Sequence, residues 1–230
     1  MKKLVVLTGA GMSAESGIST FRDNDGLWNK YRIEEVATPE AFEANPELVL
    51  EFYNFRRKQL GEVEPNEGHK ILARLQDKFD VTIITQNVDN LHERAGSKNI
   101  LHLHGELSKV RSTKYPELIY DIGTKPIKVG DICEKGAQLR PHIVWFGESV
   151  PAIDEAVPIV NSADIFVVIG TSLNVYPAAG LIMYAKHEIP KYLIDPANVD
   201  VPYNLNFTVI KKGASEGVTE LEELLINNVE

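Results

Sequence analysis

The chain has 230 residues, of which 43% are hydrophobic, and carries a formal charge of −9 at pH 7. This length and apolar content can bury a large core, which predicts one folded domain with a smaller inserted module and excludes a disordered chain. The acidic balance argues against nucleic-acid and anionic-membrane partners, because phosphate binding requires clustered Lys and Arg. A neutral or basic partner fits better.

The amino-terminal segment superficially resembles a signal peptide, because Lys2 and Lys3 precede an apolar run. Gly9 and Gly11 interrupt this run at once, so we interpret it as a first strand. Elsewhere no apolar stretch approaches the roughly 20 residues that span a bilayer. The single Cys excludes an internal disulfide. These features predict a soluble cytoplasmic protein.

Apolar, β-branched runs alternate with helical patterns along the chain. The runs are Leu4–Leu7, Val81–Ile84, Ile165–Ile169 and Tyr192–Ile194. Because they are continuously apolar, both faces of their sheet must be covered, which predicts a doubly wound, Rossmann-like α/β fold with a parallel sheet. Helices are expected between them at His69–Lys78 and Ala178–His187.

Two segments depart from this alternation and are interpreted as insertions. The segment from about residue 26 to 60 is aromatic and helical in character, and residues 107–139 contain short β-like pieces separated by Gly and Pro. Residues 1–230 are therefore expected to form one domain that carries a helical insertion and a small module.

A glycine-rich turn at Gly9 and Gly11 follows the first predicted strand. Such a turn lets backbone amides approach a pyrophosphate, with a helix N-terminus adding its dipole, or it serves packing alone. A dinucleotide site also needs an acid for the ribose hydroxyls. Asp195, at the end of a late strand, is a candidate, and its alternative role is that of a helix cap or a turn residue.

Polar residues follow two further apolar stretches. Gln86, Asn87 and Asp89 come directly after Val81–Ile84, where parallel strands face the ligand crevice, although a turn would also use Asn and Asp. His102 and His104 follow the next stretch, two residues apart on one face. A histidine here suits general-base catalysis at neutral pH. The pair could also bind a metal, but further ligands are missing nearby.

Together, these segments resemble the sirtuin family in the right order and over nearly the whole chain. The similar segments are residues 9–18, 21–23, 85–89, 104–105, 144–148 and 170–172. The resemblance implies a site for NAD. Its expected lining is Gly9, Ala10, Gly11, Ser13, Ala14, Glu15, Ser16, Gly17, Ile18, Phe21, Arg22, Trp28, Gln86, Asn87, Asp89, His104, Gly170, Thr171, Ser172, Asp195 and Ala214. Asp195 replaces the Asn usual in the family.

The resemblance implies an NAD-dependent protein-lysine deacylase that releases nicotinamide and O-acyl-ADP-ribose. His104 would then be the catalytic base, and Asn87 and Asp89 would hold the ribose and nicotinamide. An extended backbone is expected at residues 144–148, where the acyl-lysine peptide would pair as an added strand. The substrate residues in this segment are Val144, Trp145, Phe146, Gly147 and Glu148. Core packing is the alternative for the two aromatic residues.

Tyr53 and Arg56 lie three residues apart in a helical pattern and so share a face. Sirtuins that prefer acidic acyl groups carry a Tyr and an Arg at this spacing. The resemblance therefore implies a clamp for the carboxylate of succinyl-lysine or malonyl-lysine, beside activity on acetyl-lysine. The alternative is an exposed Arg56 paired with Glu47 or Glu51.

Most sirtuins bind a structural zinc through two Cys pairs after the catalytic His. This chain has Ser112-Thr113-Lys114-Tyr115 near the first pair and Cys133-Glu134-Lys135-Gly136 near the second. A zinc site needs four ligands, so no zinc is expected. Apolar contacts should hold the module instead, with these candidates: Val110, Ile119, Tyr120, Ile127, Val129 and Ile132.

Three rival functions stay open. An NAD-dependent dehydrogenase would share the glycine turn, but it usually has an acid after the second strand and a separate substrate domain. A non-catalytic ADP-ribose or acyl-lysine binding module would not need His104. Mono-ADP-ribosyl transfer could use the same site.

Overall fold

The computed structural model describes residues 1–18 and 31–227. Its large sheet has six parallel strands in the order β3-β2-β1-β7-β8-β9. The strands are β1 (Lys3–Thr8), β2 (Asp80–Thr85), β3 (Ile100–His102), β7 (Ile165–Ile169), β8 (Lys191–Ile194) and β9 (Thr208–Ile210). The prediction of a Rossmann-like parallel sheet is confirmed, and four of these strands match the apolar runs of the sequence.

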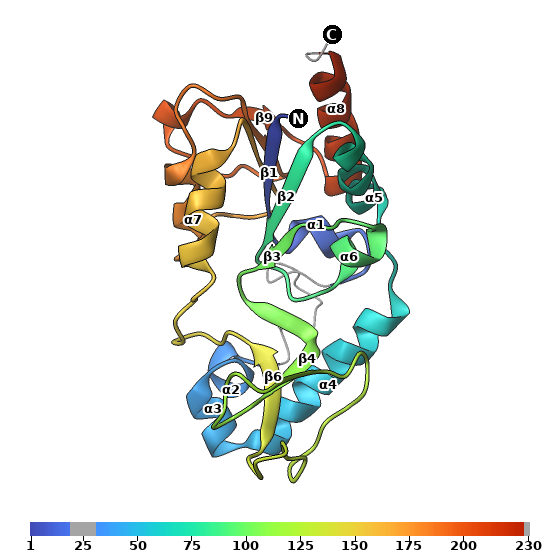
Figure 1. The fold of residues 1–230 in the computed structure, drawn as a ribbon, viewed down its shortest axis with the longest axis vertical. Coiled ribbons are helices and arrows are strands. Elements are labelled where there is room, and N and C mark those ends of the chain that lie inside the picture. Colours follow the sequence, from blue (N-terminus) through green and yellow to red (C-terminus); the bar gives the residue numbers. More distant parts are fainter. Residues whose placement is uncertain (19–30, 228–230) are drawn as a thin grey trace.

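Alternate residues of β1 serve the two faces of the sheet. Leu4 and Val6 pack on the side of α5 (Glu67–Arg74) and α8 (Ala214–Asn227). Val5 and Leu7 pack on the side of α7 (Ile153–Ser162) and the 3-10 helix η3 (Ala178–Tyr184). Figure 1 shows these layers on either side of the sheet. Burial on both faces explains why the strand is continuously apolar.

The predicted helices agree with the structure only in part. The helix expected at His69–Lys78 begins at Glu67 after the cap Asn66 and ends in the 3-10 turn η2 (Leu75–Asp77). The segment expected as a helix at Ala178–His187 is a shorter 3-10 helix instead, and it contains Gly180, which lowers helix propensity. Another 3-10 turn, η4 (Tyr203–Leu205), precedes β9.

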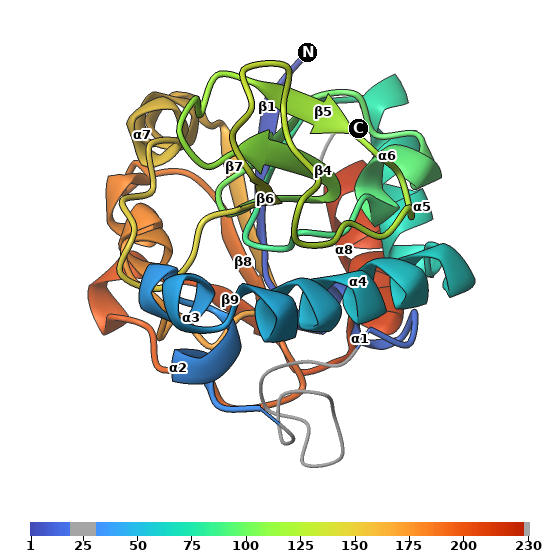
Figure 2. The ribbon, with the colours of Figure 1, turned by 90° about the horizontal axis from the view of Figure 1, so that it is seen from below.

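The second part of the molecule joins the helical insertion to a small antiparallel sheet. The helices are α2 (Ile33–Val36), α3 (Pro39–Ala44) and α4 (Pro46–Glu62), and the sheet has the order β5-β4-β6. Its strands are β4 (Gly105–Ser112), β5 (Ile119–Asp121) and β6 (Leu139–Ile143). Figures 1 and 2 show α4 lying along β4 and β6, beyond the ends of the parallel strands.

Two apolar clusters hold this part together. Val49, Phe52 and Tyr53 of α4 pack with Leu107 and Trp145. In the second cluster, Leu50 packs with Val110 and Ile127. The prediction that apolar contacts of Val110 and Ile127 hold the module is confirmed. The prediction was wrong for Ile119, Val129 and Ile132, which are exposed, because β5 is an edge strand and the segment before β6 is mostly turn.

Within the described ranges, 1–18 and 31–227, no helix combines the length and apolar character that crossing a membrane requires.

Candidate active site

The loops that follow β1, β2 and β7 meet at one edge of the large sheet. Strand pairing places Thr8 beside Thr85 on one side and beside Ile169 on the other, so the three loops leave the sheet at the same level. The strand order also reverses at β1, with β2 and β3 on one side and β7, β8 and β9 on the other. Open α/β sheets bind their ligands where the loops diverge at such a point.

Three glycines allow two of these loops to touch. A Cβ atom on Gly9 would lie 2.7 Å from the carbonyl oxygen of Gly170, and one on Gly11 would lie 2.7 Å from the Gly170 Cα. Gly170 itself has a φ of 63°, which side-chain-bearing residues rarely adopt. Close packing of backbone against backbone is therefore one reason for the glycine motif.

The amides of Gly9 and Gly11 themselves are bonded inside the protein. The amide of Gly9 donates to the carbonyl of Ile169 at 2.9 Å, and that of Gly11 to the carbonyl of Gly170 at 2.8 Å. The following helix α1 (Gly11–Ala14) is a single turn, so its dipole is small. Any phosphate at this edge must find other donors.

The remaining residues of the turn point in several directions. The Glu15 carboxylate accepts a hydrogen bond from the Ser215 amide at 3.1 Å, beside Ala214 at the start of α8. Ile18 packs against the cluster around α4. The Ser16 hydroxyl is buried, and within the described ranges it has no hydrogen-bond partner. Three expected NAD contacts fall outside the described residues: Phe21, Arg22 and Trp28.

Asn87, Ser13 and Asp89 form a buried chain of hydrogen bonds. The Asn87 amide nitrogen Nδ2 donates to Ser13 Oγ at 3.1 Å and to the Gly9 carbonyl at 3.0 Å. Ser13 Oγ donates to Asp89 Oδ2 at 2.9 Å, and Asp89 Oδ1 accepts from the Leu91 amide. Burial raises the pKa of Asp89, and these hydrogen bonds oppose that effect.

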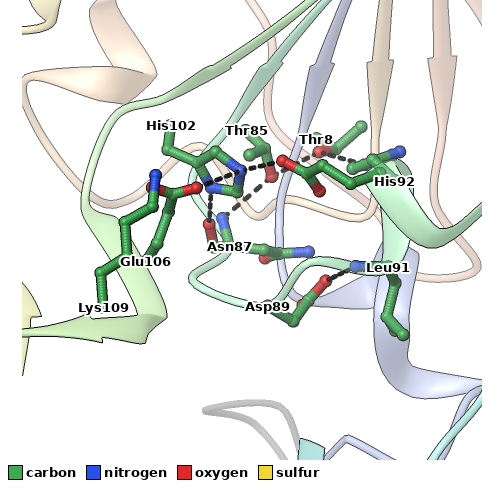
Figure 3. Close-up of polar contacts among 10 residues, drawn as sticks. Thr8, Thr85, Asn87, Asp89, Leu91, His92, His102, Glu106 and Lys109 are labelled. Carbon is green, nitrogen blue, oxygen red and sulfur yellow. Dashed lines mark hydrogen bonds and ion pairs between the residues drawn. The ribbon is translucent and has the colours of Figure 1, made fainter. Parts of the chain in front are cut away.

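His102 and His104 bind two consecutive carbonyl groups of the loop after β2. His104 Nδ1 lies 3.0 Å from the Gln86 oxygen. His102 Nδ1 lies 3.1 Å from the Asn87 oxygen, as Figure 3 shows. His104 is half-buried, and burial lowers its pKa more than the bond to Gln86 raises it. A neutral His104 whose Nδ1–H donates to Gln86 keeps a lone pair on Nε2, as a base requires.

The loop after β7 is linked to the loop after β2. Gln86 Nε2 donates to Thr171 Oγ1 at 3.2 Å. This bond joins the two loops beyond the carboxyl end of β1. Ser172 comes next and is half-buried. Asp195 is buried at the end of β8, and its Oδ1 accepts from the Ala197 amide at 2.9 Å. The turn role considered for Asp195 is therefore present in the structure.

Tyr53 and Arg56 lie next to each other on α4, and Tyr53 contacts Trp145. The Tyr53 hydroxyl is buried and accepts a hydrogen bond from Trp145 Nε1 at 3.0 Å. The Arg56 guanidinium lies 5.9 Å from the centre of the Tyr53 ring. Burial lowers the pKa of Arg56, while the charge of Asp89 raises it. No ion pair joins Arg56 to Glu47 or Glu51, although the structure describes both acids.

Residues 145–148 form a turn, so the prediction of an extended backbone over residues 144–148 is wrong. The Glu148 amide donates to the Trp145 carbonyl at 3.0 Å, and Gly147 has a φ of 89°. The Val144 amide donates to the His104 carbonyl and the Phe146 amide to the Ala37 carbonyl. These bonds are internal, and they occupy donors that strand addition would have used.

Glu148 fastens this turn to the small sheet. Its carboxylate accepts from Arg140 Nη1 at 2.7 Å and from Arg140 Nη2 at 3.0 Å. It also accepts from the Trp145 amide at 2.8 Å. The Arg140 guanidinium in turn lies 3.4 Å from the centre of the Trp145 ring. Burial raises the pKa of Glu148, but its bonds to Arg140 and Trp145 outweigh burial and lower it. Core packing of Trp145, one of the alternatives considered, is present in the structure.

The small module does not fit a zinc ion. Ser112 Oγ and Cys133 Sγ lie 3.4 Å apart, where the first and second Cys pairs would begin. Tyr115 and Gly136, at the other two positions, supply no thiolate or imidazole, and a structural zinc needs four such ligands. Other contacts hold the module: Asn54 exchanges hydrogen bonds of 2.7 and 3.0 Å with the backbone of Ile127.

We expect the purified protein to contain less than a tenth of an equivalent of zinc and to keep its melting temperature in a chelator. The physical reason is the single thiol at Cys133, because a zinc-dependent module unfolds when its metal is removed. Elemental analysis and thermal melts with and without EDTA measure both quantities. One tightly bound equivalent of zinc would contradict the prediction.

Three residues of this region are not among the predicted site residues, although one of them, Thr85, belongs to the segment 85–89 that resembles the sirtuins. Thr8 and Thr85 end neighbouring strands in register, and their hydroxyls are 2.8 Å apart. Thr85 Oγ1 also accepts from the Asn87 amide, and the buried His92 lies 3.2 Å from Thr8 Oγ1. A threonine at the last position of two adjacent parallel strands is the signal that could have indicated the first contact.

Comparison with known proteins agrees with the resemblance found in the sequence. The Sir2 family profile matches residues 9–177. An "NAD-dependent protein deacylase" of Bacteroides thetaiotaomicron is 62% identical, over 98% of this chain and 99% of that protein. A Helicobacter pylori protein of the same name is 52% identical, over 98% of both chains.

Solved structures show the same relation. The crystal structure of a Sir2 homologue–NAD complex is 41% identical, with a TM-score of 0.88, and the match covers 100% of this chain and 91% of that one. A Sir2 protein with a deacetylated p53 peptide and 3′-O-acetyl ADP-ribose is 30% identical, with a TM-score of 0.78, over 96% and 92% of the chains. The chain therefore belongs to the Sir2 family.

Proposed function

We propose that the protein is an NAD-dependent protein-lysine deacylase that transfers the acyl group to ADP-ribose and releases nicotinamide. The single observation that carries the proposal is His104, whose Nδ1 binds the Gln86 carbonyl beside the Asn87–Ser13–Asp89 chain. The names of the Bacteroides and Helicobacter relatives support the activity. The p53 peptide bound in a solved relative supports a protein or peptide substrate.

The residues at the sheet edge fit NAD. The loops of β1 and β7 diverge at the strand-order reversal, and the buried Ser16 hydroxyl lies in the first of them. Gln86 and Thr171 join the loops and offer polar atoms at the same edge. When bound, NAD supplies the ribose carbon that receives the acyl oxygen, and nicotinamide is its leaving group. The expected NAD contacts of Asp195 and Ala214 belong to this proposal.

His104 acts as the general base of the proposed reaction. Its Nε2 accepts the proton of a ribose hydroxyl, and its Nδ1–H stays on the Gln86 carbonyl, which fixes the ring and its tautomer. Because burial lowers the pKa of His104 from 6.5, the neutral form is present throughout the neutral range. Protonation of His104 should accordingly lower activity on the acid side of neutrality.

Asn87 and Asp89 orient the nicotinamide ribose in this proposal. Ser13 ties the two side chains together, so both are positioned before the ligand arrives. The Asp89 carboxylate also acts electrostatically on Arg56 of α4.

Arg56 and Tyr53 select acidic acyl groups. The guanidinium is flanked by the rings of Phe52 and Tyr53, at 5.8 and 5.9 Å, and its partial burial strengthens a bond to a carboxylate. The Tyr53 hydroxyl accepts from Trp145, so its own proton is available to a second oxygen. Succinyl-lysine and malonyl-lysine are the expected substrates, beside acetyl-lysine.

Residues 1–230 act as one catalytic domain in this proposal. The helices α2, α3 and α4 of the predicted insertion 26–60, together with the module 107–139, would enclose the acyl-lysine, and the turn in residues 144–148 would border the peptide. Val144, whose amide binds the His104 carbonyl, connects that turn to the base.

The test is a single assay on matched acetyl, malonyl and succinyl peptides, with and without NAD. Free lysine peptide, nicotinamide and O-acyl-ADP-ribose should appear in equal amounts, and only when NAD is present. Reduction of NAD without nicotinamide release would instead indicate a dehydrogenase. Labelled ADP-ribose retained on protein would indicate mono-ADP-ribosyl transfer.

A further inference from the structure

His102, at the end of β3, is enclosed by hydrogen-bond acceptors. Its Nδ1 lies 3.1 Å from the Asn87 carbonyl oxygen, and its Nε2 lies 2.7 Å from Glu93 Oε1 on α6 (Leu91–Ala95). Its side chain is 9% exposed. A backbone carbonyl carries no proton, and neither does an ionised carboxylate. Both ring nitrogens must therefore donate, which only the doubly protonated imidazolium can do.

The charges around His102 favour this imidazolium. Glu93 contributes a carboxylate from α6, and Glu106 on β4 contributes another, 3.9 Å from Nε2. Lys109 forms an ion pair with Glu106, so the four groups together are neutral (Figure 3). Burial lowers the pKa of His102, but Glu93 and Glu106 outweigh burial and raise it.

The other titratable groups near His102 have weaker effects on its protonation. His92 on α6 is buried and has a pKa well below the ordinary value, so it is neutral. Asp89 interacts with His102 through charge alone. Glu93 has a lowered pKa, which places the shared proton on the histidine and not on the carboxylate.

The protonated ring holds a loop of the proposed site. Asn87 is fixed at its amide by Thr85 Oγ1, at its side chain by Ser13 and Gly9, and at its carbonyl by His102. His104 holds the preceding carbonyl, of Gln86. A neutral His102 can donate only once, so its deprotonation releases either the loop or Glu93.

We infer that His102 is a positioning residue whose Glu93-bound imidazolium clamps the Asn87 carbonyl, and that loss of its proton sets the alkaline limit of the reaction. The alkaline limit of the reaction can be observed only if the proposed function is correct, so this part of the inference rests on it. The double protonation of the His102 ring does not depend on any activity. The neighbouring His104 faces one described hydrogen-bond acceptor, the Gln86 carbonyl, so its ring can bind that acceptor while it stays neutral.

The pH dependence of kcat/KM tests this role. The clamp is complete below the pKa of His102 and is lost as pH rises through it, so activity should fall on the alkaline side. Glu93→Gln removes the adjacent charge, which should move this alkaline limb down by about one to three pH units. Glu106→Gln, the matched control at 3.9 Å, should move it by less.

His102→Gln supplies a second arm. Glutamine can still donate once to the Asn87 carbonyl but does not titrate, so the variant should have lower activity and no alkaline limb from this residue. An unchanged alkaline limb in both Glu93→Gln and His102→Gln would overturn the positioning role. Equal melting temperatures at pH 7 and pH 9 for each variant identify a kinetic and not a folding effect.

Nitrogen NMR of ¹⁵N-histidine protein separates this inference from the proposed function. The signals that vanish in His102→Gln should show two protonated ring nitrogens at pH 7.5, whether or not the protein deacylates peptides. A singly protonated ring would overturn the inference even in an active enzyme. A possible metal site is also formed by Glu93, His102 and Glu106. If one equivalent of zinc binds tightly and removes a ring proton from His102, the cluster is a metal site and the inference is overturned.

Discussion

Replacing His104 by alanine is expected to lower kcat/KM for deacylation by about 10²–10⁴-fold, the usual contribution of a positioned general base. Among the described residues, His104 Nδ1 binds one loop carbonyl, and the ring is half-buried, so its removal takes away a proton acceptor and little packing. Initial rates on the best acyl peptide, at saturating and limiting NAD, measure the loss.

The control for this variant is His187→Ala, an exposed histidine far along the chain, which should keep full activity. His104→Ala should also melt within a few degrees of the unaltered protein. Activity within a few-fold of the unaltered protein would remove His104 as the base and leave the proposed mechanism without a proton acceptor.

Replacing Arg56 by methionine is expected to cost about 1.5–3 kcal/mol of transition-state stabilisation on succinyl and malonyl peptides, or about ten- to more than a hundredfold in kcat/KM. Acetyl peptides offer no carboxylate and should lose much less. Tyr53→Phe should change the acetyl-to-succinyl ratio in the same direction but by less, because its hydroxyl is also bound to Trp145.

Lys58→Met, an exposed position on the same helix, is the matched control and should leave the ratio unchanged. The affinity for NAD should change little in either Arg56→Met or Tyr53→Phe. Equal losses on acetyl and succinyl peptides would mean that Arg56 stabilises the helical insertion, and the preference for acidic acyl groups would be withdrawn.

Local patterns in the sequence were sufficient for the parallel sheet and for the order of its site segments. Leu4–Leu7 and Ile165–Ile169 are continuously apolar because helices cover both faces of the strands, and polar residues begin where each strand ends. The resemblance to the sirtuins added the order of the motifs, which predicted the family and the residues of the site. Helix α7 was not anticipated, because Pro158 interrupts its helical pattern.

Predictions about backbone geometry depended on contacts distant in the sequence and were less accurate. The amides of Gly9 and Gly11 are bonded to Ile169 at the end of β7 and to Gly170 after it, some 160 residues away. The pattern of residues 144–148 predicts an extended strand, but the Glu148 amide closes a turn on the Trp145 carbonyl, and bonds to His104 and Ala37 anchor that turn. The anchoring partners lie outside the local pattern.

The sequence by itself determined the fold class, the family and the residues that gather at the edge of the sheet, because strand burial and motif order are properties of the chain. Tertiary structure decided the protonation states. His102 and His104 are the same residue type two positions apart, yet one meets a carbonyl and a carboxylate and the other a single carbonyl. Only the number of acceptors that folding brings to each ring separates a fixed cation from a neutral base.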